Sequence, residues 1–263
     1  MINPRFPRPT MLAALTLTIM LSGCTEHSPI VAESLYLDAP LQDRLAPVNS
    51  ATTEDAHSPR SDIRKLSQEL GIVEDYRAAF IHGEKPAEYQ KYIVLHDTEG
   101  WGSPQSVIDY WDGNGSGVAA HFIVGVDGSV YQCVLLDKIA HHAGFGDIGN
   151  NQAFDVEDES RDDREGTVSI GPTYPDYGMN SYSVGIEMVH VGGDGDYPIE
   201  QLTALDKLIA YIDAYFGLES SIIDHKAWRS TNSDTSPEFA EYLRNYQEFR
   251  SYQAVSDAES KLE

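Results

Sequence analysis

Three short apolar runs along the chain each carry a polar side chain that is capable of chemistry. They are Tyr-Ile-Val-Leu-His-Asp at 92–97, Ala-His-Phe-Ile-Val-Gly-Val at 120–126 and Ser-Val-Gly-Ile-Glu-Met-Val-His at 183–190. Each run is rich in β-branched residues and bounded by turn formers, which predicts a β-strand. Because the apolar character is nearly continuous, we expect strands that are covered on both faces.

Helical spacing of apolar residues predicts the elements that cover this sheet. The clearest helix runs from Pro198 to Phe216, where an apolar stripe is followed by Gly217, a suitable helix stop. The segment from Asp62 to Phe80 has apolar residues at helical spacing up to Val73, which predicts a short packed helix. A last helix is expected from Pro237 to about Tyr252.

Local signals predict two further elements. One is a helix between the first and second strands, and the other is a strand that follows the second one. Ser103 as the N-cap and Pro104 as the first helical residue predict a helix that carries Val107, Ile108 and Trp111. The dipeptide Asp127-Gly128 predicts a hairpin that joins the second strand to a further strand at 129–134.

The N-terminus has the pattern of a secretion signal. Residues 1–23 contain two arginines, no acidic residue and an apolar run too short to be read first as a membrane span. The run ends in Leu-Ser-Gly-Cys24, which resembles the lipobox of bacterial lipoproteins; the alternative is an ordinary signal peptide with a chance cysteine. The resemblance implies a lipid anchor on Cys24 and a polar, proline-containing tether over 24–61. In that class an Asp after the cysteine is a signal for retention in the inner membrane, and no Asp follows Cys24. In a Gram-negative cell we therefore expect the protein in the outer membrane, facing the periplasm.

Charge and cysteine content exclude some classes of protein. The formal net charge is −24, from 18 Lys plus Arg against 42 Asp plus Glu, so the surface repels polyphosphates and nucleic acid is not an expected partner. Two cysteines are too few for a disulfide framework, and Cys133 is expected to be a small buried side chain. The acidic stretch at 153–165 predicts a solvated surface loop, with a cleft entrance or a calcium site as the alternatives.

The candidate chemistry lies at the ends of the predicted strands. His96 and Glu187 belong to the first and third runs, His225 follows the apolar pair Ile222-Ile223, and Asp234 lies nine residues further on in a polar loop. A single His near a strand end is more often a hydrogen-bonded structural residue than a ligand. Taken together, two His and two carboxylates are the raw material of a metal hydrolase.

Several longer motifs resemble the zinc-dependent N-acetylmuramoyl-L-alanine amidases of the type 2 family, whose fold is shared with peptidoglycan recognition proteins. The motifs are Ile93-Val-Leu-His-Asp-Thr-Glu-Gly100, Ala119-Ala-His-Phe-Ile-Val-Gly-Val-Asp-Gly128, Ala140-His-His-Ala-Gly144, Asn180-Ser-Tyr-Ser-Val-Gly-Ile-Glu187 and Asn232-Ser-Asp-Thr-Ser-Pro-Glu-Phe239. The resemblance implies a single α/β domain over 86–252, with a central mixed β-sheet flanked by helices. Before it we expect an N-terminal helical segment at 62–85, and after it a charged tail at 253–263.

By the same resemblance, His96, His225 and Asp234 bind one zinc ion and Glu187 is the catalytic carboxylate. His142, Asn180 and Trp101 are implied to contact the substrate, which is peptidoglycan or a muropeptide. Two His and one Asp leave the fourth tetrahedral position open, as in catalytic rather than structural zinc sites. The implied reaction is hydrolysis of the amide bond between N-acetylmuramic acid and L-alanine by a monomeric enzyme.

The chain departs from the family pattern at two positions. Asn232 replaces a Lys that relatives often carry two residues before the ligand Asp, so a neutral amide donor is expected at the developing oxyanion. Ala120 stands where some branches have a catalytic Tyr, which leaves Glu187 as the base. Two alternatives to an active amidase therefore stay open: an inactive module of this fold that binds muropeptides, and a zinc-free envelope lipoprotein with a structural role.

Overall fold

Six strands form one mixed β-sheet in the order β1-β4-β3-β5-β2-β6. The computed structural model describes residues 59–156 and 178–253. Strands β3, β5, β2 and β6 are mutually parallel, β4 is antiparallel to β3, and β1 pairs in parallel with β4. The strands are β1 (Val73–Glu74), β2 (Tyr92–Asp97), β3 (Phe122–Val124), β4 (Val130–Gln132), β5 (Ser183–Met188) and β6 (Ser221–Asp224).

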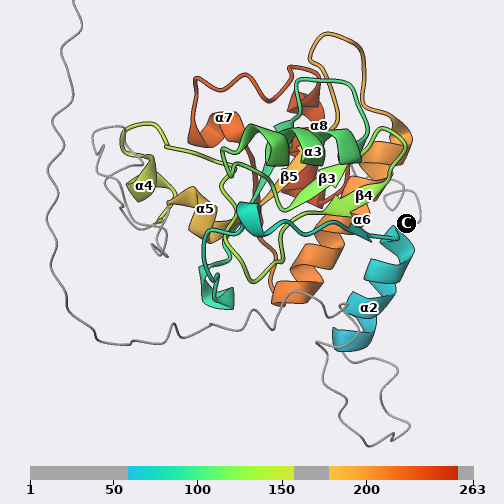
Figure 1. Ribbon diagram of the computed structural model, residues 1–263, viewed down its shortest axis with the longest axis horizontal. Coiled ribbons are helices and arrows are strands. Elements are labelled where there is room, and N and C mark those ends of the chain that lie inside the picture. Colours follow the sequence, from blue (N-terminus) through green and yellow to red (C-terminus); the bar gives the residue numbers. More distant parts are fainter. Residues whose placement is uncertain (1–58, 157–177, 254–263) are drawn as a thin grey trace, which may run out of the picture. The chain divides into compact units, whose positions relative to one another are not determined.

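Helices cover both faces of this sheet, as the continuous apolar strands predicted (Figure 1). Helices α2 and α6 lie side by side. Together with α8 they contribute to one large core cluster on one face of the sheet. Helix α3 packs on the other face. The helices are α2 (Pro59–Leu70), α3 (Pro104–Asn114), α4 (Asn150–Ala153), α5 (Met179–Tyr182), α6 (Ile199–Phe216), α7 (His225–Trp228) and α8 (Phe239–Phe249), with 3-10 turns η2 (Ala78–Phe80) and η3 (Ala87–Tyr89).

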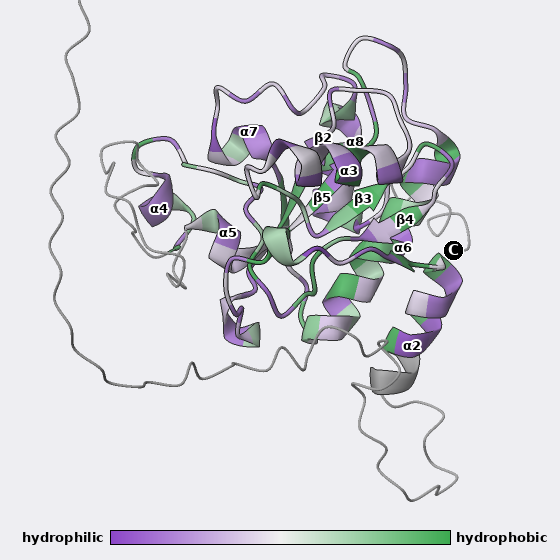
Figure 2. Ribbon diagram, viewed as in Figure 1, coloured by the Kyte–Doolittle hydropathy of each residue, from purple (hydrophilic) through white to green (hydrophobic). Residues whose placement is uncertain are grey.

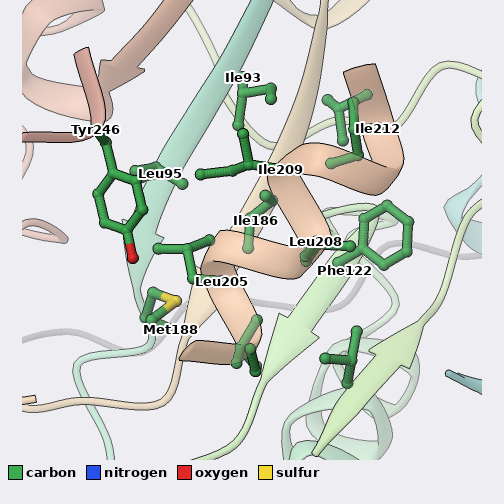
Figure 3. Close-up of a cluster of buried hydrophobic side chains, with 14 of the residues drawn as sticks. Ile93, Leu95, Phe122, Ile186, Met188, Leu205, Leu208, Ile209, Ile212 and Tyr246 are labelled. Atoms are coloured by element: carbon green, nitrogen blue, oxygen red, sulfur yellow. The ribbon is translucent and has the colours of Figure 1, made fainter. Parts of the chain in front are cut away.

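The side chains of β2 point alternately to the two faces of the sheet, and this decides on which face His96 lies. Ile93 and Leu95 point into the core cluster formed with α6 (Figure 3), whereas Val94 belongs to a separate cluster on the opposite face. Side chains in a strand alternate between faces, so His96 lies on the same face as Val94. The interior strands are accordingly mostly apolar, while α2 shows a mixed surface (Figure 2). The face opposite α6 therefore carries the chemistry.

The predicted elements are confirmed for most of the sheet and for the long helix. Strand β2 has the predicted bounds, whereas β3 and β5 are shorter than the apolar runs that contain them. The Ser103 hydroxyl accepts a hydrogen bond from the Ser106 N–H, as expected of an N-cap, and Gly217 ends α6 in the left-handed conformation. The last helix is shorter than predicted, since α8 begins at Phe239 and ends at Phe249. Cys133 is buried, as predicted.

The predicted helix from Asp62 to Phe80 is wrong beyond Leu70. Gly71 takes a left-handed φ of 58°, and its N–H bonds back to the Ser67 carbonyl, which ends the helix. Val73 lies instead in β1, where it is 42% exposed. The segment before residue 86 thus contributes an edge strand to the same sheet rather than a helix alone.

Parts of the chain to which the sequence assigns a role fall outside the described residues. These are the signal peptide at 1–23, Cys24, the tether up to residue 58, most of the acidic stretch at 153–165 and nearly all of the tail. Within the described residues, no helix combines the length and the apolar character needed to cross a membrane.

Replacing Gly128 by Ala is expected to lower the free energy of unfolding by about 1–3 kcal/mol. Gly128 has a φ of 79°, and a Cβ there would lie 2.7 Å from the Glu200 carbonyl oxygen at the start of α6. Denaturant unfolding measures the change. The matched control is Gly113→Ala inside α3, where a Cβ meets nothing within 4 Å and where a gain of about 0.5–1 kcal/mol is expected. Equal stabilities of the two variants would contradict the prediction.

Candidate active site

Three neighbouring parallel strands bring the candidate residues to one edge of the sheet. His96 near the end of β2 is the register partner of Glu187 in β5, and His225 follows directly after β6. The carboxyl ends of parallel strands share an edge, and this edge is where α/β sheets bind ligands. The sheet therefore brings together residues as far apart in the sequence as His96 and His225, which are separated by 129 positions.

His96, His225 and Asp234 form a compact cluster of possible metal ligands, whose ligand atoms all lie within 4.8 Å of one another. Asp234 Oδ2 lies 3.1 Å from His96 Nδ1 and 2.6 Å from His225 Nδ1. Both histidines are almost fully buried. The structure thus brings together two ring nitrogens and one carboxylate oxygen from the three residues predicted to bind zinc.

The hydrogen bonding of His225 fits a cation at this point. Its Nε2 lies 2.7 Å from the Ala143 carbonyl oxygen, which can only accept, so Nε2 carries a proton. In the form that binds a metal, the Nδ1 of this ring turns a lone pair toward the Asp234 carboxylate, and a cation between the two atoms would stabilise that arrangement. Within the described residues, Asp234 Oδ1 is buried without a hydrogen-bond partner. The donor set suits zinc with one position left open.

The protonation of the cluster also suits metal binding. Burial, followed by the neighbouring His225, lowers the pKa of His96 to about 4, so its ring is neutral at physiological pH. A neutral imidazole and an ionised carboxylate are the forms that bind zinc.

Glu187 is the carboxylate beside the cluster. Its Oε2 is buried and has no hydrogen-bond partner among the described residues. Burial raises the pKa of Glu187 well above its usual value, and the negative charges of Asp234, Asp97 and Glu99 raise it further. A carboxylate whose pKa is raised toward neutrality is suited to accept and return a proton.

A cleft of about 340 Å³ opens over Glu187 and Asp234. Trp101 forms part of its wall, is 54% exposed and donates a hydrogen bond from Nε1 to Asp194 at 2.9 Å. Tyr110 and Trp111 of α3 also line the cleft. Sequence reasoning used Trp111 only as a packing residue and assigned no role to Tyr110. Tyr110 and Trp111 follow Val107 by three and four residues, so the three side chains lie on one face of the helix. This spacing was the sequence signal that they line one surface together.

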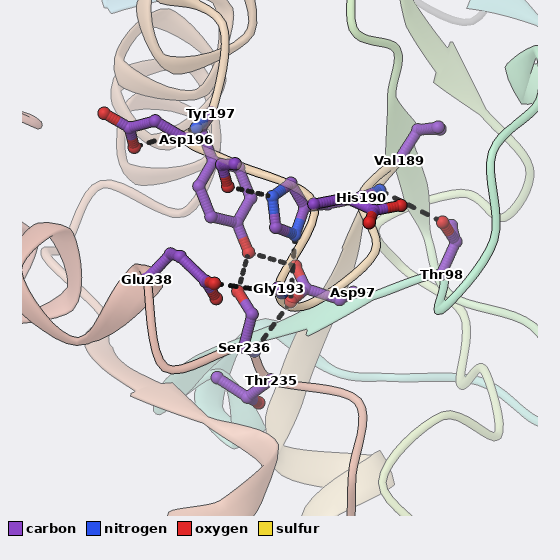
Figure 4. Close-up of polar contacts among 12 residues, drawn as sticks. Asp97, Thr98, Val189, His190, Gly193, Asp196, Tyr197, Thr235, Ser236 and Glu238 are labelled. Carbon is purple, nitrogen blue, oxygen red and sulfur yellow. Dashed lines mark hydrogen bonds and ion pairs between the residues drawn. The ribbon is translucent and has the colours of Figure 1, made fainter.

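A hydrogen-bond network behind the cluster holds the loop that carries Asp234 (Figure 4). The Asp97 backbone N–H donates to the Asp234 carbonyl at 2.7 Å, and the Asp97 carboxylate accepts from the Tyr197 hydroxyl at 2.5 Å and from the Ser236 N–H at 2.7 Å. The His190 ring stacks on Tyr197 with centroids 3.9 Å apart. The sequence did not predict this network, because its members come from three segments that are distant from one another in the sequence.

The other predicted site residues do not line the cleft. His142 and Asn180 are buried behind the cluster: His142 contacts the rear of His96, and the Asn180 side chain bonds to the backbone of His142 and Ala143. Asn232 lies in the ligand loop, and its Nδ2 is buried without a hydrogen-bond partner within the described residues. The predicted substrate contacts of His142 and Asn180 are thus not visible in the geometry.

A parallel sheet edge with a His–His–Asp cluster, a partnerless carboxylate and an adjoining cleft is typical of metal-dependent hydrolases. Comparison with known families narrows this class. The model of the N-acetylmuramoyl-L-alanine amidase family matches residues 86–238, which is more than half of the chain. The chain therefore belongs to this family.

The solved structures give weaker similarities. The endolysin N-acetylmuramoyl-L-alanine amidase LysCS from Clostridium intestinale URNW is 18% identical, with a TM-score of 0.44 over 64% of this chain and 88% of that chain. The hydrolase AmiA from Staphylococcus aureus is 15% identical, with a TM-score of 0.41 over 70% of this chain and 80% of that chain. No curated protein matches the chain.

Proposed function

We propose that this protein is a zinc-dependent amidase that hydrolyses the bond between N-acetylmuramic acid and L-alanine in peptidoglycan or muropeptides. The observation that carries the proposal is the convergence of His96 Nδ1, His225 Nδ1 and Asp234 Oδ2 beside Glu187. Membership of the amidase family supplies the reaction class. All four residues needed for catalysis are present, which favours an enzyme over an inactive binding module.

The roles of the residues follow from their chemistry. A zinc ion held by the cluster would polarise the scissile carbonyl and lower the pKa of a water molecule. Glu187 Oε2 would accept a proton from the attacking water and return it to the departing L-alanine nitrogen. Asn232 has an unused donor, Nδ2, in the loop that carries Asp234, but this atom is buried outside the cleft, so it would reach the developing oxyanion in place of a Lys only after the loop moves.

The cleft walls would position the substrate. Trp101 and Tyr110 are 54% and 69% exposed, so their rings are free to pack against a sugar or peptide group. The carboxylates of Asp97, Glu99 and Asp234 line the same cleft, together with Glu187. Because this wall is strongly acidic, the anionic groups of a muropeptide would point toward solvent rather than into the cleft.

The test is release of free peptide from purified muropeptides by the purified full chain. We expect cleavage at the muramoyl–alanine bond with bound zinc, loss of cleavage after chelation, and recovery when zinc is added back. Mass spectrometry of the products identifies the bond. A chain that binds zinc and muropeptide but releases no peptide would contradict the proposal and would instead indicate a binding module.

We also propose, from the sequence alone, that the enzyme is lipid-anchored through Cys24 at the bacterial envelope, in the outer membrane facing the periplasm. The supporting observations are the signal-peptide pattern of residues 1–23 and the Leu-Ser-Gly-Cys motif. An anchored amidase that faces the periplasm would lie close to the cell wall. Fractionation of wild type and Cys24→Ser tests the anchor, since the variant should leave the membrane fraction.

A further inference from the structure

His142 lies behind the metal cluster rather than in the cleft. Its ring is buried, with Nδ1 3.1 Å from His96 Nε2 and Nε2 3.1 Å from Ser183 Oγ. The Ser183 hydroxyl lies in turn 2.6 Å from the Met179 carbonyl oxygen. These contacts form a series of hydrogen bonds that runs from the Met179 carbonyl, through Ser183 and His142, to Nε2 of His96, the ring nitrogen that faces away from Asp234.

The direction of each hydrogen bond in this series follows from the Met179 carbonyl at its end. The Met179 carbonyl can only accept, so it takes the single proton of the Ser183 hydroxyl. Ser183 Oγ must therefore accept from His142 Nε2–H. In a neutral ring with a proton on Nε2, Nδ1 is an acceptor, and it receives the bond from His96 Nε2–H.

The environment of His142 keeps its ring neutral. The ring is buried, and among the described residues its nitrogens contact an imidazole and a hydroxyl but no carboxylate, so nothing in reach would stabilise a charged ring. A proton on His96 Nε2 leaves its other nitrogen, Nδ1, with a lone pair directed at the cluster. This nitrogen lies 3.1 Å from Asp234 Oδ2.

We propose that His142 is a positioning residue that, held by Ser183, fixes His96 in the tautomer whose Nδ1 is free to bind the metal. A ligand histidine commonly gives its second N–H to a carboxylate, a carbonyl or water, which sets its tautomer and orientation. Here a second histidine accepts that proton. The inference rests on the metal site of the proposed function but not on its substrate.

Two further features hold the His142 ring and backbone in place. Gly185 of β5 makes room for the ring, because a Cβ there would lie 2.5 Å from His142 Cγ. Asn180 Oδ1 accepts hydrogen bonds from the N–H groups of His142 at 2.9 Å and Ala143 at 2.8 Å.

Residues 142 and 143 together set both ligand histidines. The His142 ring accepts from His96, and the Ala143 carbonyl accepts from His225 Nε2 at 2.7 Å. Asn180 fixes the backbone of this pair, so one short buried segment orients two ligands that come from different elements, β2 and α7. This gives the Ala-His-His-Ala-Gly motif a role in assembling the metal site.

The experiment measures the zinc affinity of the full chain by competition with a chromogenic chelator. His142→Leu removes the acceptor and is expected to weaken zinc binding by about 10–100-fold. His142→Asn places a carboxamide oxygen near the position of Nδ1 and is expected to retain most of the affinity. Wild-type affinity in His142→Leu, or an equal loss in both variants, would overturn the proposal.

Ser183→Ala keeps the proposal testable if His142→Leu does not fold. It removes one hydroxyl and leaves His142 Nε2 without its acceptor, so a weaker zinc affinity is expected; an unchanged affinity would overturn the proposal. In the zinc-loaded chain, nitrogen NMR of the His142 ring should show the proton on Nε2, and a proton on Nδ1 would contradict it. A chain that binds zinc in this pattern without releasing peptide would contradict only the proposed function.

Discussion

Glu187→Gln is expected to lower kcat for muropeptide cleavage by about 10²–10⁴-fold while zinc affinity stays close to that of wild type. Glutamine keeps the size of the side chain but cannot accept the proton of the attacking water. Zinc affinity should be retained because the cluster consists of His96, His225 and Asp234. Peptide release and zinc affinity, measured on the same preparation, test both halves of the prediction. An active Glu187→Gln enzyme would require another base.

Glu99→Gln is the matched control, because Glu99 lines the same cleft but is exposed. It should keep most of the activity and change only the pH profile. Glu187 must be ionised to act as a base, so activity falls as the pH falls through its pKa. The Glu99 charge contributes to the raised pKa of Glu187. Neutralising it should therefore move the acid limb of kcat/KM to lower pH.

Asp234→Asn is expected to weaken zinc binding by more than about 100-fold, since losing a residue that only orients a ligand already costs about 10–100-fold. The variant removes the one negative charge among the three ligands and leaves two neutral imidazoles. Peptide release should fall with metal occupancy at limiting zinc. Chelator competition gives the affinity, and the zinc concentration needed for half-maximal activity gives an independent value.

Asp112→Asn controls for the change in net charge. Asp112 forms a surface ion pair with Arg77 at 3.4 Å and lies outside the metal cluster. Its replacement should leave zinc affinity and cleavage unchanged. Equal zinc affinities of the Asp234→Asn and Asp112→Asn variants would exclude Asp234 as a ligand.

The strands could be predicted from the sequence because their signals are local, and the resemblance of longer motifs to a known family indicated the candidate ligand residues. The run that forms β2 is apolar, short and bounded by turn formers, and its His is brought beside Glu187 by simple parallel pairing. The edge strand β1 could not be predicted, because a strand of two residues is too short to show the alternation of apolar and polar side chains. The Gly71 helix stop was present in the sequence, but the apolar spacing was extended past it to Val73.

The surroundings of the cluster could not be predicted in the same way. The motif around His142 marks it as important but does not say whether its ring faces the cleft or the rear of His96. That orientation depends on Ser183 and on the space above Gly185, which only the folded sheet brings together. The environment of Asp97 likewise depends on Tyr197 and Ser236, more than 90 residues away in the sequence.

The Asp97 network has a consequence for the binding of a metal ion at the proposed site. The loop with Asp234 lacks regular structure, yet it is tied to β2 next to His96 by backbone and side-chain hydrogen bonds. Its conformational entropy is therefore lost when the chain folds and would not be lost again when a metal ion binds. The binding site is preorganised, so an ion would meet ligand side chains that are already held in position.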